Sequence, residues 1–151
     1  MSRILAGVAA LVIALSAGPG FAQEKLAVWW IKGFYKAEDE ALFAAIRKFE
    51  TRTGVKVDLS QYAAEDMIPK TVAALESGSP PDIAYSDTYD VQVAARWAFD
   101  GKLEDISDVI EPMRDRFMPL TIDSAYLYDG KPGKKAFYGF VLKQKMLHVA
   151  Y

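Results

Sequence analysis

One short stretch, residues 26–31, limits the folds open to this chain more than any other. It reads Leu-Ala-Val-Trp-Trp-Ile, an unbroken apolar run rich in β-branched and aromatic residues. Lys32 and Gly33 end the run, and a long helical pattern follows. A run of this length beside a helix predicts a strand buried on both faces, as in parallel sheets. Ligands of open α/β sheets bind beyond the carboxyl ends of the strands, so we expect the binding residues there.

The first predicted helix covers residues 37–53, where apolar residues recur at helical spacing. Glu38, Asp39 and Glu40 crowd its first turn, where negative charge complements the helix dipole. Gly54 follows in the position of a left-handed C-terminal cap. The expected apolar face consists of Leu42, Phe43, Ala45, Ile46 and Phe49.

Two further strand-and-helix pairs follow. Residues 55–59 alternate apolar and polar, which predicts a strand near a sheet edge, and residues 64–77 predict a helix with Pro69 in its first turn. Residues 82–86 predict a short buried strand, and residues 87–99 one further helix. The order β-α-β-α-β-α predicts a parallel sheet flanked by helices. The expected inner faces are Ile68, Val72 and Leu75, then Val91, Ala94, Ala95 and Ala98.

The rest of the chain is less regular. Pro112 limits a short helical piece, and helical turns are predicted over residues 114–117 and 120–126. Residues 137–142 predict a fourth strand and residues 146–151 a fifth. Because the chain stops inside an apolar strand, we expect it to be a piece of a larger protein.

The N-terminus predicts a cleaved export signal over residues 1–22. Arg3 precedes an uncharged apolar core, and Gly20-Phe21-Ala22 places small residues at the −3 and −1 positions before Gln23. The alternative, a membrane anchor, is disfavoured because the apolar run falls short of the ~20 residues that span a bilayer. The sequence has no cysteine, so it offers no thiolate metal site and no lipid-attachment residue. We therefore expect a periplasmic protein without a lipid anchor.

Composition and motifs narrow the function further. The net charge is −2 and no basic patch stands out in the sequence, so nucleic acid is not an expected partner. The chain lacks a G-x-S-x-G elbow, a G-x-x-x-x-G-K-[ST] loop and a G-x-G-x-x-G turn. The one histidine, His148, lies in an apolar run typical of a structural histidine. We predict neither an enzyme nor a cofactor or metal site.

The order of several short motifs resembles the N-terminal lobe of family 1 extracellular solute-binding proteins. These are sugar-capturing subunits of bacterial ABC importers, and maltose-binding protein is a well-known relative. The resemblance covers almost the whole chain after the export signal. It rests on the order and spacing of the 26–30 strand, Phe49-Glu50 with Thr53-Gly54-Val55-Lys56-Val57, Gly78-Ser79-Pro80-Pro81-Asp82-Ile83, Gly101-Lys102-Leu103-Glu104-Asp105-Ile106, and Lys134–Phe140 leading to Tyr151.

The resemblance implies one lobe of a two-lobed protein that closes on a sugar. Residues 23–142 would form the N-terminal α/β lobe, residues 143–151 would begin the hinge, and the second lobe would be missing. A strand from that second lobe would normally lie between the third and fourth strands, so its absence would leave an open sheet edge. The implied partners are a carbohydrate and the inner-membrane permease subunits, and the protein would be a monomer. A fragment of this kind should bind sugar weakly or not at all.

Sugar recognition needs aromatic faces for the C–H side of the ring and fixed polar groups for its hydroxyls. At the first strand end, Trp30 is the first choice for stacking ahead of Trp29, although core packing is an equal alternative. Lys32 and Tyr35 lie in the loop just beyond. Glu38 is the acid nearest that loop, against the alternative that it only complements the helix dipole.

The other candidates follow later strands. Ser86 and Asp87 end the third strand, where the resemblance implies polar ligand contacts, although Asp87 is also suited to cap a helix. Gln144 lies at the implied hinge, where a solvated loop is the alternative. Tyr89 is a weaker candidate, and Trp97 is expected in the core. Maltose-binding relatives tend to carry an acid in the hinge stretch, so their sugar preference is not carried over.

Two other functions stay open on the sequence. One is an exported α/β hydrolase that uses Asp82 or Asp87. The other is a binding protein for a solute such as a polyamine or iron. A cleft crowded with carboxylates would favour a cation, and paired aromatic rings would favour a sugar.

Overall fold

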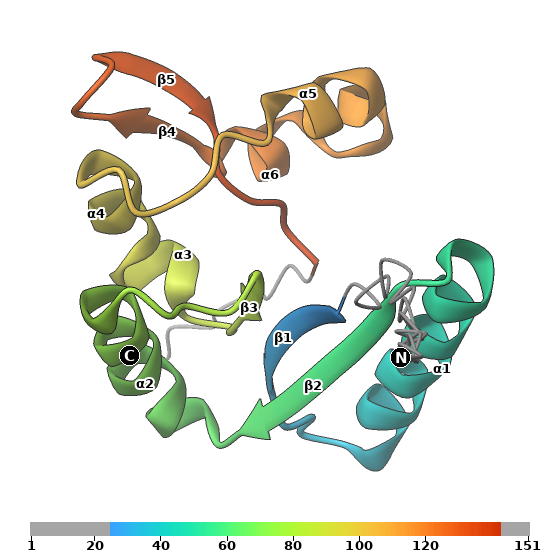
Figure 1. The fold of residues 1–151 in the computed structure, drawn as a ribbon. Coiled ribbons are helices and arrows are strands. Elements are labelled where there is room, and N and C mark those ends of the chain that lie inside the picture. Colours follow the sequence, from blue (N-terminus) through green and yellow to red (C-terminus); the bar gives the residue numbers. More distant parts are fainter. Residues whose placement is uncertain (1–24, 143–151) are drawn as a thin grey trace, which may run out of the picture.

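Figure 1 shows the computed structural model of the chain, which describes residues 25–142. The predicted export signal, the hinge residues 143–151 with Gln144, and the predicted fifth strand over residues 146–151 lie outside the described range. Within that range, no helix is both long and apolar enough to cross a bilayer.

A three-stranded parallel sheet forms the lower half of the view in Figure 1. It consists of β1 (Lys25–Ile31), β2 (Lys56–Tyr62) and β3 (Ile83–Tyr85) in the order β2-β1-β3. Two helices connect the strands, α1 (Lys36–Thr53) and α2 (Ala64–Ser77). The parallel α/β architecture predicted from the sequence is therefore confirmed, with β1 at the centre and β2 at an edge.

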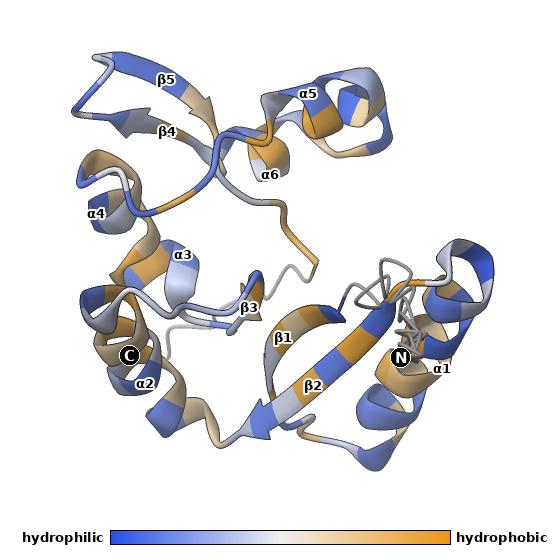
Figure 2. Ribbon diagram, viewed as in Figure 1, coloured by the Kyte–Doolittle hydropathy of each residue, from blue (hydrophilic) through white to orange (hydrophobic). Residues whose placement is uncertain are grey.

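The alternation of side chains places the two helices on opposite faces of the sheet. Gln61 and Tyr62 are neighbours in β2 and therefore point to opposite faces. The Gln61 side-chain amide donates to Asp39 of α1 at 2.8 Å, whereas the Lys70 ammonium of α2 lies 5.0 Å from the centre of the Tyr62 ring. Figure 1 agrees, with α1 and α2 on either side of β1 and β2. Figure 2 shows the matching alternation of hydropathy along β2.

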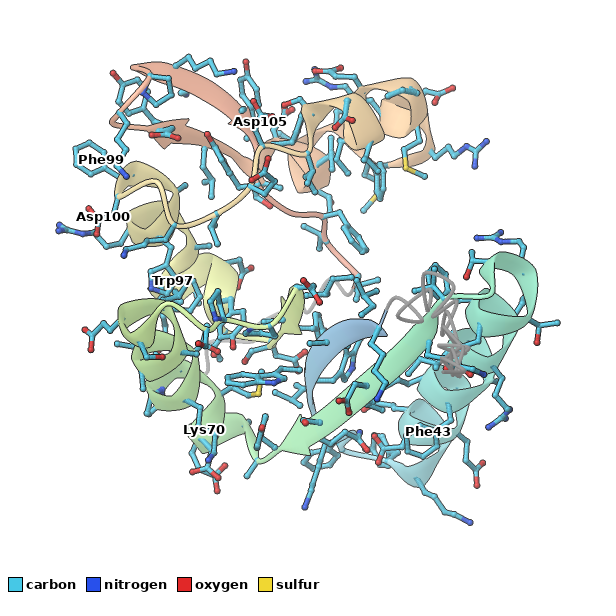
Figure 3. The ribbon with its side chains drawn as sticks, in the orientation of Figure 1. Phe43, Lys70, Trp97, Phe99, Asp100 and Asp105 are labelled. Carbon is cyan, nitrogen blue, oxygen red and sulfur yellow. The ribbon has the colours of Figure 1, made fainter. Side chains whose placement is uncertain are left out.

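The α1 helix follows its sequence signals closely. Gly54 caps it in the left-handed region at φ 78° and donates its N–H to the Glu50 carbonyl at 2.9 Å. Leu42, Ile46 and Phe49 are half-buried as predicted. The prediction was wrong for Phe43 and Ala45, which are exposed, so the stripe that α1 turns to the sheet is narrower than predicted. Phe43 is labelled on α1 in Figure 3.

The α2 helix departs from prediction in two respects. Pro69 is not in the first turn, because the helix begins five residues earlier at Ala64, so its ring interrupts the regular hydrogen bonding. The buried residues are Met67, Thr71 and Ala74, one position before the predicted stripe. Ile68, Val72 and Leu75 are only half-buried. The helix is therefore rotated by about one residue from the orientation that hydropathy alone predicted.

The third strand was predicted to be buried, but Ile83 is 43 % exposed. Among residues 25–142, β3 pairs only with β1, so its outer edge has no neighbour there. Exposure at this position follows from that open edge.

The predicted helix over residues 87–99 is divided into α3 (Tyr89–Gln92) and α4 (Ala94–Phe99). Val93 breaks it with φ −137° and ψ −27°. Tertiary contacts hold both sides of the break, because Tyr89 bonds Thr71 of α2 and lies edge-on to Trp97. Ala98 is buried and Ala94 half-buried as the predicted inner face requires, but Ala95 and Val91 are exposed.

The upper half of Figure 1 is built on a β-hairpin and short helices. β4 (Tyr126–Asp129) pairs antiparallel with β5 (Lys134–Phe137) as a separate sheet. The fourth strand predicted over residues 137–142 was wrong in its bounds, because β5 ends at Phe137. The extension of helical turns to Tyr126 was also wrong, because Tyr126 begins β4. The turn signals of residues 129–133 close this hairpin instead.

A small core joins the hairpin to α5 (Ser107–Ile110), the 3₁₀ helix η1 (Glu111–Arg116) and α6 (Pro119–Asp123). Its buried members are Ile110, Ile122, Ala125 and Phe137, with Ile106 and Phe117 packed against them.

Candidate functional site

A row of three side chains crosses the carboxyl edge of the parallel sheet. Trp30 of β1 is in register with Gln61 of β2 on one side and Tyr85 of β3 on the other. Residues paired in this way point to the same face of a sheet. The Trp30 and Tyr85 rings stack with centroids 4.3 Å apart and planes inclined by 30°. We call Gln61, Trp30 and Tyr85 the rim row.

Carboxylates hold both ends of the rim row. Asp39 accepts the Gln61 side-chain amide at 2.8 Å, and the Tyr85 hydroxyl donates to Asp87 at 2.6 Å. Burial, the hydrogen bond to Asp87 and the negative charges of Asp87, Glu38 and Asp90 raise the pKa of Tyr85 well above its usual 10.0. Tyr85 therefore stays protonated at neutral pH, and three carboxylates lie within electrostatic reach of it.

The acids of the first turn of α1 also hold the loop after β1. Asp39 accepts the Gly33 backbone N–H, and Glu38 accepts the Phe34 backbone N–H, both at 2.9 Å. The first turn of a helix carries positive partial charge, which favours carboxylates there. The loop that carries Lys32 and Tyr35 is thereby fixed to the start of α1.

The structure brings some of the predicted ligand-binding residues together and separates others. Trp30 and Asp87 lie on either side of Tyr85, and Glu38 is near enough to influence the Tyr85 hydroxyl. Tyr35 is 66 % exposed and lies edge-on to Phe34, and Lys32 is exposed. Ser86 is buried, with its hydroxyl 3.3 Å from that of Thr88.

One face of the Trp30 ring is covered. Tyr85 stacks on it, so a sugar would have to use the opposite face of Trp30 or the outer face of Tyr85. Trp29 points to the other face of the sheet and lies edge-on to Tyr62 at 5.3 Å. The structure thus separates the two tryptophans that the sequence places side by side.

A surface hollow borders this edge. It measures about 520 Å³ and lies between the N-terminal half of α2 and the segment of Thr88 and α3. Thr88 connects it to the rim, because Thr88 lines the hollow and its hydroxyl faces Ser86. The lining residues are Ala64, Glu65, Ile68, Pro69, Thr88 and Gln92. Their carboxylate, hydroxyl and amide groups are of the kind that bonds sugar hydroxyls.

A larger hollow, about 600 Å³, lies on η1 and α6, away from the strand ends. Its principal charged group, Arg114, already pairs with Asp123 at 2.9 Å and with Glu111 at 3.7 Å. We place the candidate site at the sheet edge, because parallel strand ends and paired aromatic rings converge only there within residues 25–142. In the same described range, no three histidine or carboxylate side chains are grouped closely enough to hold a metal ion.

Other residues singled out by the sequence have structural contacts. The Tyr89 hydroxyl is 2.6 Å from that of Thr71 and 3.4 Å from the Met67 carbonyl oxygen, and its ring meets Trp97. Asp82 lies before β3, where its carboxylate accepts the Ala27 N–H at 2.7 Å. Asp82 and Asp87 thus stand at opposite ends of β3, and each carboxylate accepts a hydrogen bond from the protein.

The sequence analysis missed Tyr85, Gln61 and Thr88. Tyr85 is the last residue of β3, Gln61 is the penultimate residue of β2, and Thr88 follows β3. Their part in the site depends on strand register, which local sequence does not encode. The nearest signal was the position of Tyr85 two residues before Asp87, on the last position of a short strand.

Comparison with known families gives an extended match. The profile of the family described as bacterial extracellular solute-binding protein matches residues 44–151. This range includes β2, β3 and the whole hairpin region. No curated protein matched the chain.

Two solved structures share the fold. A solute-binding protein of an ABC transporter from Thermotoga lettingae, bound to α-D-tagatose, is 23 % identical with a TM-score of 0.60. CpMnBP1 with mannotriose bound is 16 % identical with a TM-score of 0.55. The similar regions cover 69 % and 76 % of this chain, but only 26 % and 27 % of those chains. The chain thus corresponds to about a quarter of the length of these proteins.

Proposed function

This chain belongs to the bacterial extracellular solute-binding proteins, and we propose that it serves carbohydrate uptake as part of an ABC importer's binding subunit. The family match over residues 44–151 carries this proposal. Binding proteins of this family capture a solute and do not transform it, so we infer a role without catalysis.

The sheet edge supports a carbohydrate as the solute. Trp30 and Tyr85 form a stacked aromatic pair, the Asp87 carboxylate bonds the Tyr85 hydroxyl, and Gln61 is paired with Trp30 across the strands. Sugars are recognised by this combination of an apolar ring face and fixed hydrogen-bonding groups. Lys32, Tyr35, Glu38 and Ser86 remain proposed contributors at this edge. Gln144, outside the described residues, remains a proposed contributor from the hinge.

We propose that residues 23–142 act as the N-terminal lobe and that residues 143–151 lead towards a second lobe. Ligand contacts made by both lobes together would drive closure, because a ligand shifts an equilibrium only by its difference in affinity for the two states. The closed form would then dock on permease subunits in the inner membrane. Export to the periplasm by residues 1–22, without a lipid anchor, and a monomeric state belong to the same proposal.

Nuclear magnetic resonance titration of the ¹⁵N-labelled chain with mannotriose and with tagatose tests the proposal. We expect the amides of residues 30–33 and 85–88 to shift, with a Kd weaker than about 1 mM because one lobe supplies only part of the contacts. Micromolar affinity would contradict the two-lobe proposal. No shift at these amides with either sugar at about 50 mM would contradict carbohydrate binding at this edge.

A cationic solute is the second candidate, because Asp87, Glu38 and Asp90 all act on the Tyr85 hydroxyl. Spermidine serves as the competing probe in the same titration. Shifts at residues 85–90 with spermidine and none with the sugars would favour the cation. The hydrolase alternative, which would use Asp82 or Asp87, has less support. The Asp82 carboxylate accepts the Ala27 N–H, and the Asp87 carboxylate accepts the Tyr85 hydroxyl.

A further inference from the structure

We infer that Tyr85 is a positioning residue of the candidate site, whose hydroxyl orients the Asp87 carboxylate while its ring holds Trp30. This inference rests on the proposed function and deepens it. It assigns to Tyr85 the task of presenting two ligand-binding groups in one fixed arrangement.

The first support is the geometry around Tyr85. Its hydroxyl donates to Asp87 Oδ1 at 2.6 Å, a short distance typical of a bond to a charged acceptor. Its ring stacks on Trp30 with centroids 4.3 Å apart. One half-buried side chain therefore contacts the principal aromatic candidate on β1 and the principal polar candidate after β3.

The second support is the backbone at this point. β3 has three residues, and Asp87 lies two residues beyond its end, past the last β1–β3 pair, which is Trp30 with Tyr85. A side-chain bond from the last residue of the strand therefore adds a restraint on Asp87 to those that its other contacts supply. A restricted group loses less conformational entropy when it binds a ligand.

The third support is the direction of the hydrogen bond. The Tyr85 hydroxyl has one proton, and Asp87 accepts it. Towards a ligand, the Tyr85 oxygen and the Asp87 carboxylate then act as acceptors. The pair is thus arranged for a ligand that donates hydrogen bonds, as sugar hydroxyls do.

Tyr85→Phe tests the inference, because it removes the hydroxyl and keeps the ring that stacks on Trp30. Tyr62→Phe is the matched control, since Tyr62 is the last residue of β2 and contacts Trp29 on the opposite face. Two measurements are made on the ¹³C,¹⁵N-labelled chain. One is the set of Hα–Hβ couplings of Asp87, which report its side-chain rotamer without ligand, and the other is the affinity for mannotriose and tagatose.

We expect unequal Asp87 couplings in the wild type and in Tyr62→Phe, as one rotamer requires, and averaged couplings in Tyr85→Phe. Tyr85→Phe should also weaken sugar binding about tenfold, with the Trp29 and Tyr62 resonances unchanged.

Three results separate the possible failures. Unchanged couplings in Tyr85→Phe overturn the positioning role, whatever the affinity. If the Asp87 couplings of Tyr85→Phe are averaged but its sugar affinity is unchanged, the positioning of Asp87 by Tyr85 does not matter for binding. If neither sugar shifts the rim of the wild type, the carbohydrate proposal fails, and the couplings still decide whether Tyr85 orients Asp87.

Discussion

At the scale of single residues, Tyr85 shows how one side chain can combine packing with polar organisation. Its ring stacks on Trp30, and its hydroxyl donates a hydrogen bond to Asp87, the polar candidate that follows β3. The pKa of Tyr85 therefore depends on the groups around it, and this dependence can be measured.

We predict that Asp87→Asn lowers the pKa of Tyr85 towards 10.0, because it removes a charge that disfavours the phenolate. The folded-state pKa of Tyr85 is raised above its unfolded value. Its contribution to stability is therefore complete below about pH 10 and is lost as pH rises further. Following the Tyr85 Cζ resonance against pH tests this. An unchanged midpoint in Asp87→Asn would show that burial alone sets the shift.

A second prediction concerns Asp105, which lies between the hairpin and α5 (Figure 3). Hydrogen bonds from Ser107, then from Lys134 at 3.0 Å, lower the pKa of Asp105 to about 2 from 3.8. Asp105 therefore contributes stability above about pH 4 that is lost as pH falls towards 2. Asp105→Asn should lower the Tm at pH 7, and its Tm should converge with the wild type near pH 2.

Circular dichroism melts at several pH values measure that convergence. Asp58→Asn, at an exposed position of β2, controls for the change in net charge. A gap between Asp105→Asn and wild type that persists at low pH would contradict the assigned cause.

At the scale of elements, Pro69 lies in the interior of α2, whereas the sequence analysis placed it in the first turn. Pro69 cannot donate to the Glu65 carbonyl, so one regular helix bond is missing. We predict that Pro69→Ala raises the free energy of unfolding by about 1–3 kcal/mol. Pro119→Ala is the control, because Pro119 begins α6, where no helical N–H bond is lost.

Urea denaturation of both variants measures the difference. Equal effects of the two substitutions would mean that the proline acts through the unfolded chain alone. Glu65 and Pro69 both line the hollow beside α2. A sugar titration of Pro69→Ala will therefore also show whether this side of the hollow affects sugar binding.

At the scale of the whole molecule, the hairpin region has a cluster of buried apolar side chains of its own, Ile110, Ile122, Ala125 and Phe137. Phe137 is fully buried in this cluster, and its carbonyl accepts the Ile106 N–H at 2.8 Å. Its ring also lies 5.5 Å from the Arg114 guanidinium. Phe137 thus contacts both the segment before α5 and η1, and Lys134 of the same strand adds its bond to Asp105.

We predict that Phe137→Ala lowers the free energy of unfolding by about 3–5 kcal/mol, the usual range for a buried phenylalanine. Phe140→Ala, half-exposed and three residues further on, should change it by less than about 0.5 kcal/mol. Chemical denaturation compares the two. Similar losses for both variants would contradict the assignment of Phe137 to the core.

The sequence by itself determined the features that depend on neighbours along the chain. Helical periodicity predicted α1 and α2, and Gly54 and Gly78 ended them because glycine adopts positive φ without strain. The apolar run of residues 26–31 and the β-α order predicted the parallel sheet. These signals are local, so they can be read without knowing what the segments contact.

Only the tertiary structure decided which distant residues meet. The break at Val93 follows from contacts of Tyr89 with α2 and Trp97. Trp30 meets Tyr85 because of the β1–β3 register, and a shift of one residue would send Tyr85 to the opposite face. Strand register is set by packing between remote segments, which no local pattern records.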